Sequence, residues 1–231
     1  MKDITDERST LEKPLSFQKM RFRYYLAKRL LPKNQVLDIG CGNGYGADYF
    51  LLDYSGIDYY YKAIEEANKN YFLNDFNVME LPSGLSNYKD NSQENIICCE
   101  LIEHLSYNDG QKLLNEIHRI LNPEGYLFLT TPIYKNQKEL YKNHIQEYSK
   151  SEMKEFLLRY DFKIIKEGGY YTTYLIDFLR FIRGKNKSEN FSLRTKEKKT
   201  KWLLIKITKI SNLLGYYFPS IAKHQWYLCQ K

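Results

Sequence analysis

One stretch near the beginning of the chain constrains the possible folds more than any other. Residues 36–47 read Val-Leu-Asp-Ile-Gly-Cys-Gly-Asn-Gly-Tyr-Gly-Ala. A short apolar run with one acid passes into alternate glycines and then into helix-forming residues, which predicts a strand, a tight turn and a helix. Because glycine tolerates positive φ and has no Cβ, the backbone of such a turn can lie directly against a ligand. The stretch therefore predicts a cofactor-binding turn.

Two kinds of cofactor are compatible with a glycine-rich turn after the first strand of an α/β fold. The dinucleotide pattern G-x-G-x-x-G fails at Tyr45 when it is counted from Gly40, and from Gly42 it is met only in the looser form that ends in alanine. Asp38 also stands where a dinucleotide-binding domain usually has an apolar residue. Residues 37–44 instead resemble the first motif of class I S-adenosylmethionine (SAM) dependent methyltransferases.

The resemblance implies that SAM is the cofactor and that this turn contacts it. The residues implied are Asp38, Gly40, Cys41, Gly42 and Gly44. The alternative is a glycine-rich turn that binds nothing, which the entropy cost of repeated glycines disfavours.

A second acid follows the glycine motif at a distance that suits a ribose contact. Residues 54–58 predict a short strand that ends in Asp58, 18 residues after Gly40, close to the ~20-residue offset of nucleotide-binding α/β folds. An ionised carboxylate has two acceptor oxygens for two adjacent ribose hydroxyls. We therefore expect Asp58 to bind the ribose, the alternative being an ordinary surface acid.

The adenine contact is harder to assign, because the segment before Pro82 is short. In the methyltransferases an Asp and a small or apolar residue after the third strand bind the adenine. The resemblance assigns these roles to Asp75 and Phe76, and it leaves Asn77 and Glu80 as competing candidates.

A second resemblance follows the predicted buried strand at residues 96–99. Residues 100–105 read Glu-Leu-Ile-Glu-His-Leu and resemble the E-x-I-E-H-L segment of small-molecule methyltransferases. The resemblance implies that Glu100 lies at the cofactor. The sequence departs from the family just upstream, with Gln-Glu-Asn at residues 93–95.

A third resemblance precedes a predicted helix. Residues 143–148 read Asn-His-Ile-Gln-Glu-Tyr, and a capping box formed by Ser149 and Glu152 follows. This segment resembles N-x-F-H-x-x-E-Y in methyltransferases of sugar and cell-envelope polysaccharide pathways. The resemblances together cover roughly residues 16–168, and they imply a sugar or a nucleotide-sugar as the methyl acceptor.

Histidine is the best candidate for a catalytic base among the residues of the predicted site. A hydroxyl or protonated amine must lose a proton when it accepts a methyl group, and histidine titrates in the required range. His104 and His144 fall in loops at the carboxyl edge of the predicted sheet, where ligands of open α/β folds bind. We favour His144, with Glu147 orienting either this histidine or the acceptor, because His104 can instead pack beneath the cofactor. His118 and His224 are expected to be structural or exposed.

The pattern of elements predicts an α/β fold, a doubly wound Rossmann-like class I methyltransferase sheet with an antiparallel last strand. We expect a cap helix at residues 16–31 and a helix capped by Asn108 or Asp109. The basic segment 21–25 of the cap helix is expected to be a solvated face, the alternative being a contact to the substrate. A turn at residues 122–125 should precede a strand at 126–131. The expected organisation is a single domain over residues 1–231: an N-terminal arm and cap helix (1–32), a SAM-binding core (33–168), a helical basic insertion (169–223) and the last strand (224–231).

The positive charge of the chain is concentrated in the insertion. The net charge is +7, and residues 183–201 contribute eight basic and two acidic residues. A nucleic-acid partner is therefore not expected, because the basic footprint avoids the cofactor core. Leu203, Ile207, Ile210 and Leu214 predict one apolar stripe. The segment 172–217 is expected either to pack on the sheet edge or over the acceptor pocket, or to contact an anionic membrane surface.

The cysteines and the N-terminal residues bear on the expected compartment. Cys41, Cys98, Cys99 and Cys229 show no C-x-x-C spacing and read as reduced, packed thiols. No metal site, signal peptide or spanning segment is expected, so the predicted location is the cytoplasm, with peripheral contact to the inner face of the membrane as the alternative.

The predicted function is transfer of a methyl group from SAM to an oxygen or nitrogen of a small polar acceptor. A lipid or quinone acceptor at the membrane surface is the runner-up, which the apolar insertion favours. A SAM-binding protein without turnover is the alternative outside enzymes. The sequence does not define the acceptor or the oligomeric state.

Overall fold

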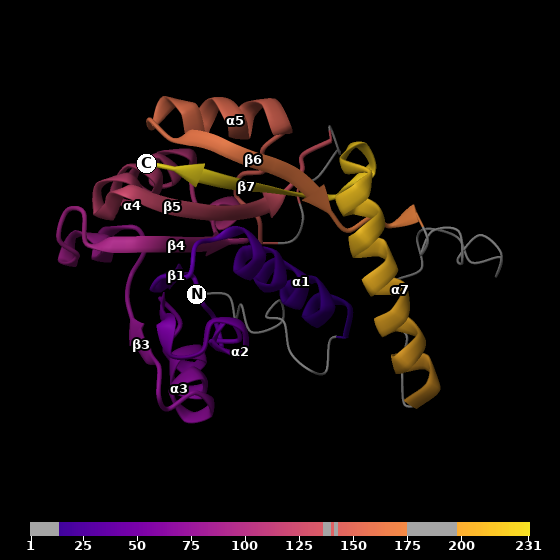
Figure 1. Cartoon of the computed structure of the whole chain (residues 1–231). Helices are drawn as coiled ribbons and strands as arrows, with labels where there is room; N and C mark the ends of the chain where they lie inside the picture. Colours follow the sequence, from indigo (N-terminus) through magenta and orange to yellow (C-terminus); the bar gives the residue numbers. More distant parts are fainter. Residues whose placement is uncertain (1–13, 136–139, 141–142, 175–197) are drawn as a thin grey trace. The chain divides into compact units, whose positions relative to one another are not determined.

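The computed structural model describes residues 14–135, 140, 143–174 and 198–231. The predicted N-terminal arm and most of the basic run at 183–201 lie outside the described residues. The described part of the chain forms one sheet with the strand order β3-β2-β1-β4-β5-β7-β6 (Figure 1). Its strands are β1 (Val36–Ile39), β2 (Tyr54–Asp58), β3 (Asp75–Val78), β4 (Gln93–Cys99), β5 (Leu121–Pro132), β6 (Lys163–Tyr170) and β7 (His224–Gln230).

The strand directions confirm the predicted fold class. Strands β1 to β5 pair in parallel, and β7 runs in the opposite direction (Figure 1). The strand order reverses beside β1, which pairs with β2 on one side and with β4 on the other. In open α/β sheets this reversal opens a crevice at the carboxyl ends of the strands, where ligands bind. The glycine turn that follows β1 lies at this point.

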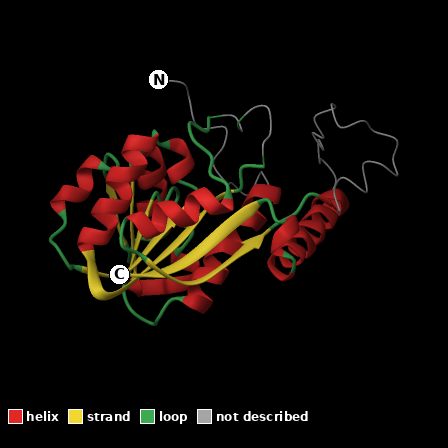
Figure 2. Ribbon diagram, turned by 90° about the horizontal axis from the view of Figure 1, so that it is seen from above, coloured by secondary structure: helices red, strands yellow, loops and turns green. Residues whose placement is uncertain are grey.

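Helices lie on both faces of the sheet (Figure 2). They are α1 (Pro14–Leu30), α2 (Ala47–Phe50), α3 (Tyr61–Asn70), α4 (Tyr107–Ile120), α5 (Lys150–Arg159) and α7 (Lys198–Tyr217). The predicted capping box of α5 is present at Ser149 and Glu152. The predicted cap of α4 is wrong, because Ser106 accepts a hydrogen bond from the backbone N–H of Asp109 at 3.1 Å. Asp109 therefore occupies the third position of the helix, where an acid is favourable near the positive end of the helix dipole.

The predicted turn at residues 122–125 is also wrong, since this segment belongs to β5. Residues 121 and 126 both pair with β4, and a register shift between Gln93 and Asn95 absorbs the extra residues between them. An irregularity of this kind lets a segment that contains proline and glycine stay within a strand.

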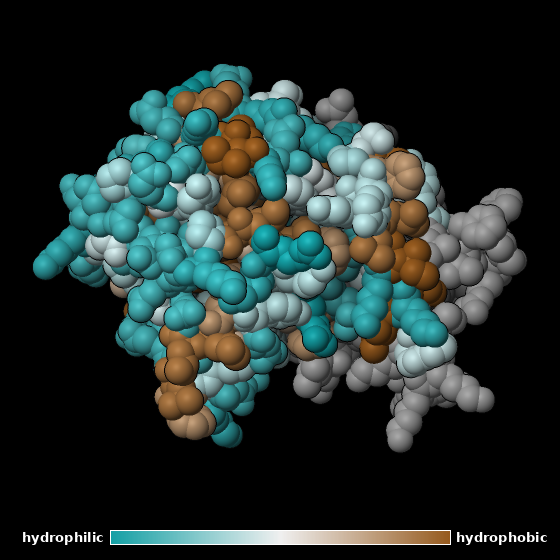
Figure 3. Space-filling view, viewed as in Figure 1, coloured by the Kyte–Doolittle hydropathy of each residue, from teal (hydrophilic) through white to brown (hydrophobic). Residues whose placement is uncertain are grey.

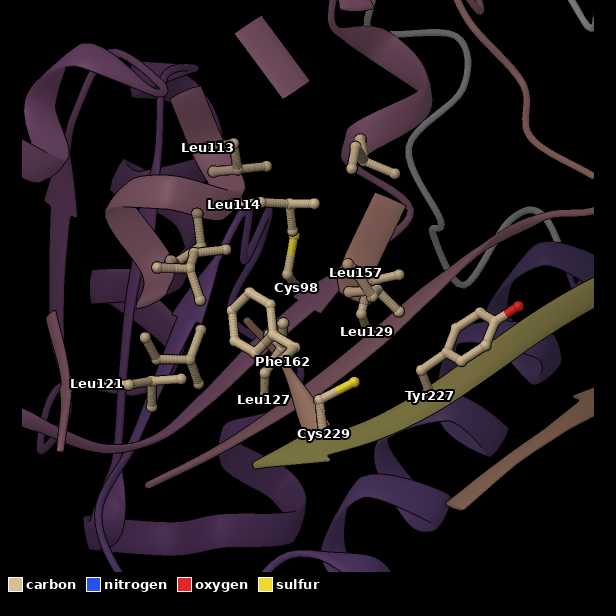
Figure 4. Close-up of a cluster of buried hydrophobic side chains, with 14 of the residues drawn as sticks. Cys98, Leu113, Leu114, Leu121, Leu127, Leu129, Leu157, Phe162, Tyr227 and Cys229 are labelled. Atoms are coloured by element: carbon tan, nitrogen blue, oxygen red, sulfur yellow. The ribbon is translucent and has the colours of Figure 1, made fainter. Parts of the chain in front are cut away.

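Every second residue of β1 and β4 contributes its side chain to one hydrophobic core, because successive side chains of a strand point to opposite faces of the sheet. Leu37 and Ile39 of β1 belong to a buried cluster with α4 and α5, as do Ile96 and Cys98 of β4. Figure 4 shows side chains of this cluster from α4, β4, β5, α5 and β7 meeting at the sheet. Each fully buried leucine contributes on the order of 1.5–3 kcal/mol by leaving water. The other face of β1 carries Asp38, which becomes part of the site described below.

The chain divides into two compact units. One unit consists of residues 23–167 and 225–231 and contains the glycine turn and both histidine loops. The other consists of residues up to Phe22 and residues 168–224. Within this second unit, the side-chain amide of Asn212 in α7 donates to the carbonyl of Gln18 at 3.2 Å, which joins α7 to the first turns of α1. The predicted single domain over 1–231 stays a prediction.

Helix α7 has an unusual distribution of polar and apolar side chains. Thr208, Ser211 and Asn212 are buried, while Trp202 and Ile210 are 57% and 49% exposed. The predicted stripe is therefore wrong, because Ile207 is buried whereas Ile210 faces solvent. Figure 3 shows hydrophobic side chains gathered over α7. Among the helices that the structure describes, none is both long and apolar enough to cross a bilayer.

Candidate active site

The glycine turn after β1 has a backbone that only glycine adopts without strain. Gly40, Gly42 and Gly44 have φ angles of 82°, 54° and 74°, in the left-handed region that side chains disfavour. At Gly44 an added Cβ would also lie 2.7 Å from the ring of Phe76. The backbone N–H of Gly40 donates to the carbonyl of Ile57 at 2.8 Å, which ties the turn to β2. The turn is thus a rigid, side-chain-free cradle.

Asp58 ends β2 directly beside this cradle. Its Oδ2 accepts a hydrogen bond from the backbone N–H of Gly42, and its Oδ1 accepts one from the backbone N–H of Tyr60, both at 2.9 Å. Each carboxylate oxygen has a second lone pair. The carboxylate is therefore held in place beside the glycine turn. This geometry fits the ribose role predicted for Asp58.

Asp38 lies on the face of β1 that α1 covers, and its side chain is completely buried. Its Oδ2 accepts from the hydroxyls of Tyr24, at 2.6 Å, and Tyr54. Burial raises the pKa of Asp38 to about 6, although both tyrosine hydrogen bonds and the charge of Arg23 act in the opposite direction. Its Oδ1 has no hydrogen-bond partner among the described residues. Asp38 thus anchors α1 to β1 through Tyr24.

Glu100 follows β4 and has a positive φ of 52°. Its Oε1 accepts from the hydroxyl of Thr130 at 2.9 Å, and its Oε2 lies 3.5 Å from the guanidinium of Arg23. The Arg23 side chain is only 13% exposed. The prediction that residues 21–25 form a solvated face is therefore wrong for this arginine, which α1 delivers to the carboxyl edge of the sheet.

A second group of polar side chains forms where the loop after β4 meets the loop before α5. It consists of Glu103, His104 and His144, which we call the Glu103 cluster. One ligand-type atom from each residue lies within 4.8 Å of the others. The two imidazole rings are 5.0 Å apart between centroids and nearly perpendicular. The tertiary structure thus brings both predicted catalytic histidines into one site.

Glu103 is the buried member of this cluster, with 1% of its surface exposed. Its Oε2 accepts from the hydroxyl of Thr131 at 3.0 Å, whereas its Oε1 has no hydrogen-bond partner within the described part of the chain. Burial, together with the nearby charge of Glu100, raises the pKa of Glu103 well above its usual value. The site therefore contains a carboxyl group whose ionised form lacks a full set of partners.

Two oxygen acceptors orient the histidine rings. His144 Nδ1 lies 2.6 Å from Oε1 of Glu147, and His104 Nδ1 lies 3.0 Å from the carbonyl oxygen of Asn143. A carbonyl or a carboxylate can only accept, so each Nδ1 carries the proton, and each neutral ring has its lone pair on Nε2. The carbonyl of Glu103 accepts from the backbone N–H groups of residues 145 and 146, which fixes one loop on the other.

The other two histidines pack against aromatic rings, which agrees with the structural role that was predicted as one of two options. His118 belongs to α4, where its ring meets the edge of Phe162 at 5.3 Å. His224 begins β7 and stacks on Tyr170 within the other compact unit.

Comparison with known proteins finds a family model that matches the core of the sheet. Residues 37–129 match the model of a family described as a methyltransferase domain. The chain is 32% identical over 125 residues to an uncharacterized protein of Methanocaldococcus jannaschii, covering 52% of this chain and 50% of that protein. It is 28% identical over 138 residues to a probable S-adenosylmethionine-dependent methyltransferase, Rv3030, of Mycobacterium tuberculosis, covering 56% and 48%. The chain thus spans about half the length of these relatives.

Structural comparison gives the same fold over nearly the whole chain. A SAM-dependent methyltransferase from Archaeoglobus fulgidus superposes with a TM-score of 0.62 at 16% identity, covering 94% of both chains. Residues 37–129 thus match a methyltransferase domain, and the sheet has the fold of class I SAM-dependent methyltransferases. SAM is the cofactor, as the glycine motif predicted.

The structure does not place the two residues that were predicted to bind the adenine where the sequence analysis expected them. Asp75 and Phe76 were expected to follow the third strand, but they begin β3 and pair with residues at the start of β2. Asp75 therefore lies at the amino end of the strand, away from Asp58, which pairs with Val78. Phe76 is buried beneath Gly44 and is part of the core. The placement predicted for both residues is wrong.

Glu80 is the acid that follows β3 in the methyltransferase domain, and its side chain is exposed. It was a competing candidate for the adenine contact and now becomes the preferred one. The misassignment arose because a four-residue strand gives little periodicity by which to fix its ends.

Two residues of the site, Arg23 and Glu103, received no specific role from the sequence. Arg23 lies far from the motifs in the chain, and a basic residue on a predicted helix carries no signal of what it faces. Glu103 stands inside the recognised segment 100–105, but roles were assigned only to its neighbours Glu100 and His104. The available signal was its position beside His104 in a short turn after a buried strand.

Proposed function

We propose that this protein transfers the methyl group of SAM to an oxygen or nitrogen of a small polar acceptor. The observation that carries the proposal is that the predicted cofactor residues and the histidine pair lie at the same edge of the sheet. The glycine turn follows β1, Asp58 ends β2 and the Glu103 cluster follows β4, and these three strands are neighbours. The cofactor residues and the histidine pair therefore share the carboxyl edge of one parallel sheet.

Bound SAM supplies a methyl group that is already activated on a sulfonium. A lone pair of the acceptor forms the new bond to the methyl carbon, and the electron pair of the broken carbon–sulfur bond stays on sulfur. The protein must align the acceptor, exclude water and provide for the loss of one proton from the acceptor. We assign the proton-handling role to the Glu103 cluster, with Glu147 fixing the orientation of His144.

The acceptor class that we propose is a sugar or a nucleotide-sugar. The support is the Asn-His-Ile-Gln-Glu-Tyr segment at 143–148, which resembles methyltransferases of sugar and envelope-polysaccharide pathways. The polar character of the Glu103 cluster is consistent with a hydroxyl-bearing acceptor, because its donors and acceptors can replace the hydrogen bonds that a sugar makes with water.

A lipid or quinone acceptor is a second candidate, because α7 exposes apolar side chains. Trp202, Ile210, Leu213 and Tyr217 are each 46% or more exposed. They recur at intervals that place them along one side of the helix. Lys206 lies in this row, with its ammonium 3.7 Å from the centre of the Trp202 ring. Such a surface suits contact with an anionic membrane.

The test is the release of S-adenosylhomocysteine by purified protein supplied with SAM and panels of acceptors. Nucleotide-sugars and free sugars form one panel, and lipid and quinone precursors in detergent form the other. Turnover with the first panel supports the proposal, and turnover with the second alone supports the second candidate. SAM binding without release in either panel or in a cell extract would favour a binding protein that does not turn over.

A further inference from the structure

The Glu103 cluster has the composition of a transition-metal site. Two imidazoles and one carboxylate form a donor set that first-row transition metals accept, including the catalytic zinc sites that combine two histidines with a glutamate. Ligand atoms about 2.1 Å from a common ion are at most ~4.2 Å apart. The three donors of the cluster already lie within 4.8 Å of one another, so a small side-chain movement is enough to bring them onto one ion.

The hydrogen bonds around the cluster have the pattern that metal-ligating histidines need. A ligating histidine almost always donates its other ring N–H to a carboxylate or a backbone carbonyl, which fixes its tautomer. His144 does so to Glu147 at 2.6 Å, and His104 to the carbonyl of Asn143 at 3.0 Å. Two histidines from different loops therefore carry the same tautomer, in which Nε2 is the unprotonated ring nitrogen.

The carboxylate of the cluster provides an independent argument. Glu103 is 1% exposed, and its Oε1 lacks a hydrogen-bond partner among the described residues. Burying an ionised carboxylate without a partner is costly, and a bound cation removes that cost. The guanidinium of Arg23 lies 3.5 Å from the carboxylate of Glu100. Thr131 meanwhile holds the other oxygen of Glu103, as expected for the supporting shell of a ligand.

We infer that Glu103, His104 and His144 bind one divalent transition cation of the zinc type. The sequence alone gave no metal site, because its ligands come from two loops. Three protein ligands leave coordination positions open, as in catalytic rather than structural metal sites. The cation site stands independently of the proposed function, whereas the role we give it rests on methyl transfer.

That role is to receive the acceptor hydroxyl at an open position. A metal-bound hydroxyl loses its proton to solvent at a lower pH than a free one, before the methyl group is transferred, so the acceptor becomes a better nucleophile. His144 then acts as a ligand instead of as the proton acceptor, and Glu147 is a positioning residue that acts through it.

Direct metal binding tests the site without any acceptor. The full chain, purified without a histidine tag and treated with a chelator, is titrated with Zn²⁺ by calorimetry and with Co²⁺ by visible absorption. Mg²⁺, which prefers an all-oxygen shell, serves as the comparison ion. We expect one equivalent of Zn²⁺ and of Co²⁺, a Co²⁺ spectrum typical of nitrogen ligation, and much weaker binding of Mg²⁺.

Substitutions locate the ion. We expect Glu103→Gln, His104→Ala and His144→Ala each to weaken Co²⁺ binding at least tenfold, and Glu147→Gln to weaken it 10- to 100-fold as a supporting residue. His118→Gln removes a histidine of α4 outside the cluster and should bind as the wild type does. Circular dichroism and SAM titration show that each variant is folded. The inference is overturned if folded wild-type protein binds neither Zn²⁺ nor Co²⁺, if it binds only Mg²⁺, or if the cluster variants bind as tightly as His118→Gln.

The outcome for the metal site is distinguishable from that for the proposed function. Metal binding without any turnover leaves the site in place and counts against methyl transfer. Turnover by chelator-treated protein that binds no metal removes the cation and returns His144 to the role of a base.

Discussion

The side chain of Glu147 is completely buried, and its Oε1 lies 2.6 Å from Nδ1 of His144. A buried carboxylate beneath a histidine fixes the ring in one tautomer and one direction, so that Nε2 is the nitrogen that acts. The pair comes from a single short segment ahead of α5, and backbone hydrogen bonds to Glu103 hold that segment on the loop after β4. Three predictions concern SAM binding, turnover and stability, and a fourth concerns α7.

Replacing His144 by Ala is expected to lower the methyl-transfer rate at least a hundredfold while SAM affinity is retained. Loss of a proton-transfer group typically costs 10²- to 10⁴-fold in rate, and loss of a ligand to the inferred cation would remove the same activation of the acceptor. SAM affinity should be retained because His144 lies outside the glycine turn. The measurement is S-adenosylhomocysteine release with the true acceptor, with calorimetry for SAM. Near wild-type turnover in both His144→Ala and His104→Ala would mean that neither histidine assists the acceptor.

Replacing Asp58 by Ala is expected to weaken SAM binding at least tenfold. The change removes hydrogen bonds from ribose hydroxyls to a charged group, worth on the order of 1.5–3 kcal/mol. Asp75→Ala is the matched control, because Asp75 is an acid at the opposite end of the neighbouring strand. Calorimetric titration should find unchanged affinity in the control. Equal affinities in wild type and Asp58→Ala would remove Asp58 from the site.

Asp38 is expected to make stability fall as pH rises. Its pKa is 3.8 in the ordinary, unfolded environment and is raised to about 6 in the folded protein. Between pH 3.8 and about pH 6, Asp38 is therefore ionised in the unfolded chain but still protonated in the folded protein. Raising the pH through this range stabilises the unfolded chain relative to the folded protein. The penalty is absent below about pH 4 and complete above about pH 6, where it amounts to about 3 kcal/mol. Asn cannot ionise, yet its carbonyl oxygen can still accept from the tyrosines.

The measurement is urea unfolding of wild type and Asp38→Asn at several pH values without SAM. The difference in the free energy of unfolding, variant minus wild type, should increase by up to about 3 kcal/mol from pH 4 to pH 7. A difference that stays constant with pH would show that Asp38 does not titrate in this range.

The membrane candidate makes a separate prediction for α7. If the exposed apolar row contacts an anionic surface, the protein should sediment with anionic vesicles at low salt and be released at high salt. Trp202→Ser removes a large exposed ring and should reduce the bound fraction. Protein that remains in the supernatant under all conditions rules this candidate out, and the row then covers another surface.

The sequence by itself determined the parts of the site that depend on local backbone. Gly40 and Gly44 adopt positive φ, so the turn could be recognised from residue type alone. Asp58 follows because a strand, a short helix and a second strand of ordinary lengths return the chain to the same edge of the sheet. The capping box of α5 is likewise a relation between residues three positions apart.

Tertiary structure decided everything that depends on register or on distant segments. The pairing of β3 with β2 moved Asp75 to the far end of the sheet, because a short strand does not fix its own register. The orientation of α1 brought Arg23 to Glu100. The convergence of Glu103, His104 and His144 required two loops to meet through backbone hydrogen bonds, and no local spacing encodes that distance. Side chains within one element are related by helix or strand geometry, whereas those on separate loops are related only by how the elements pack.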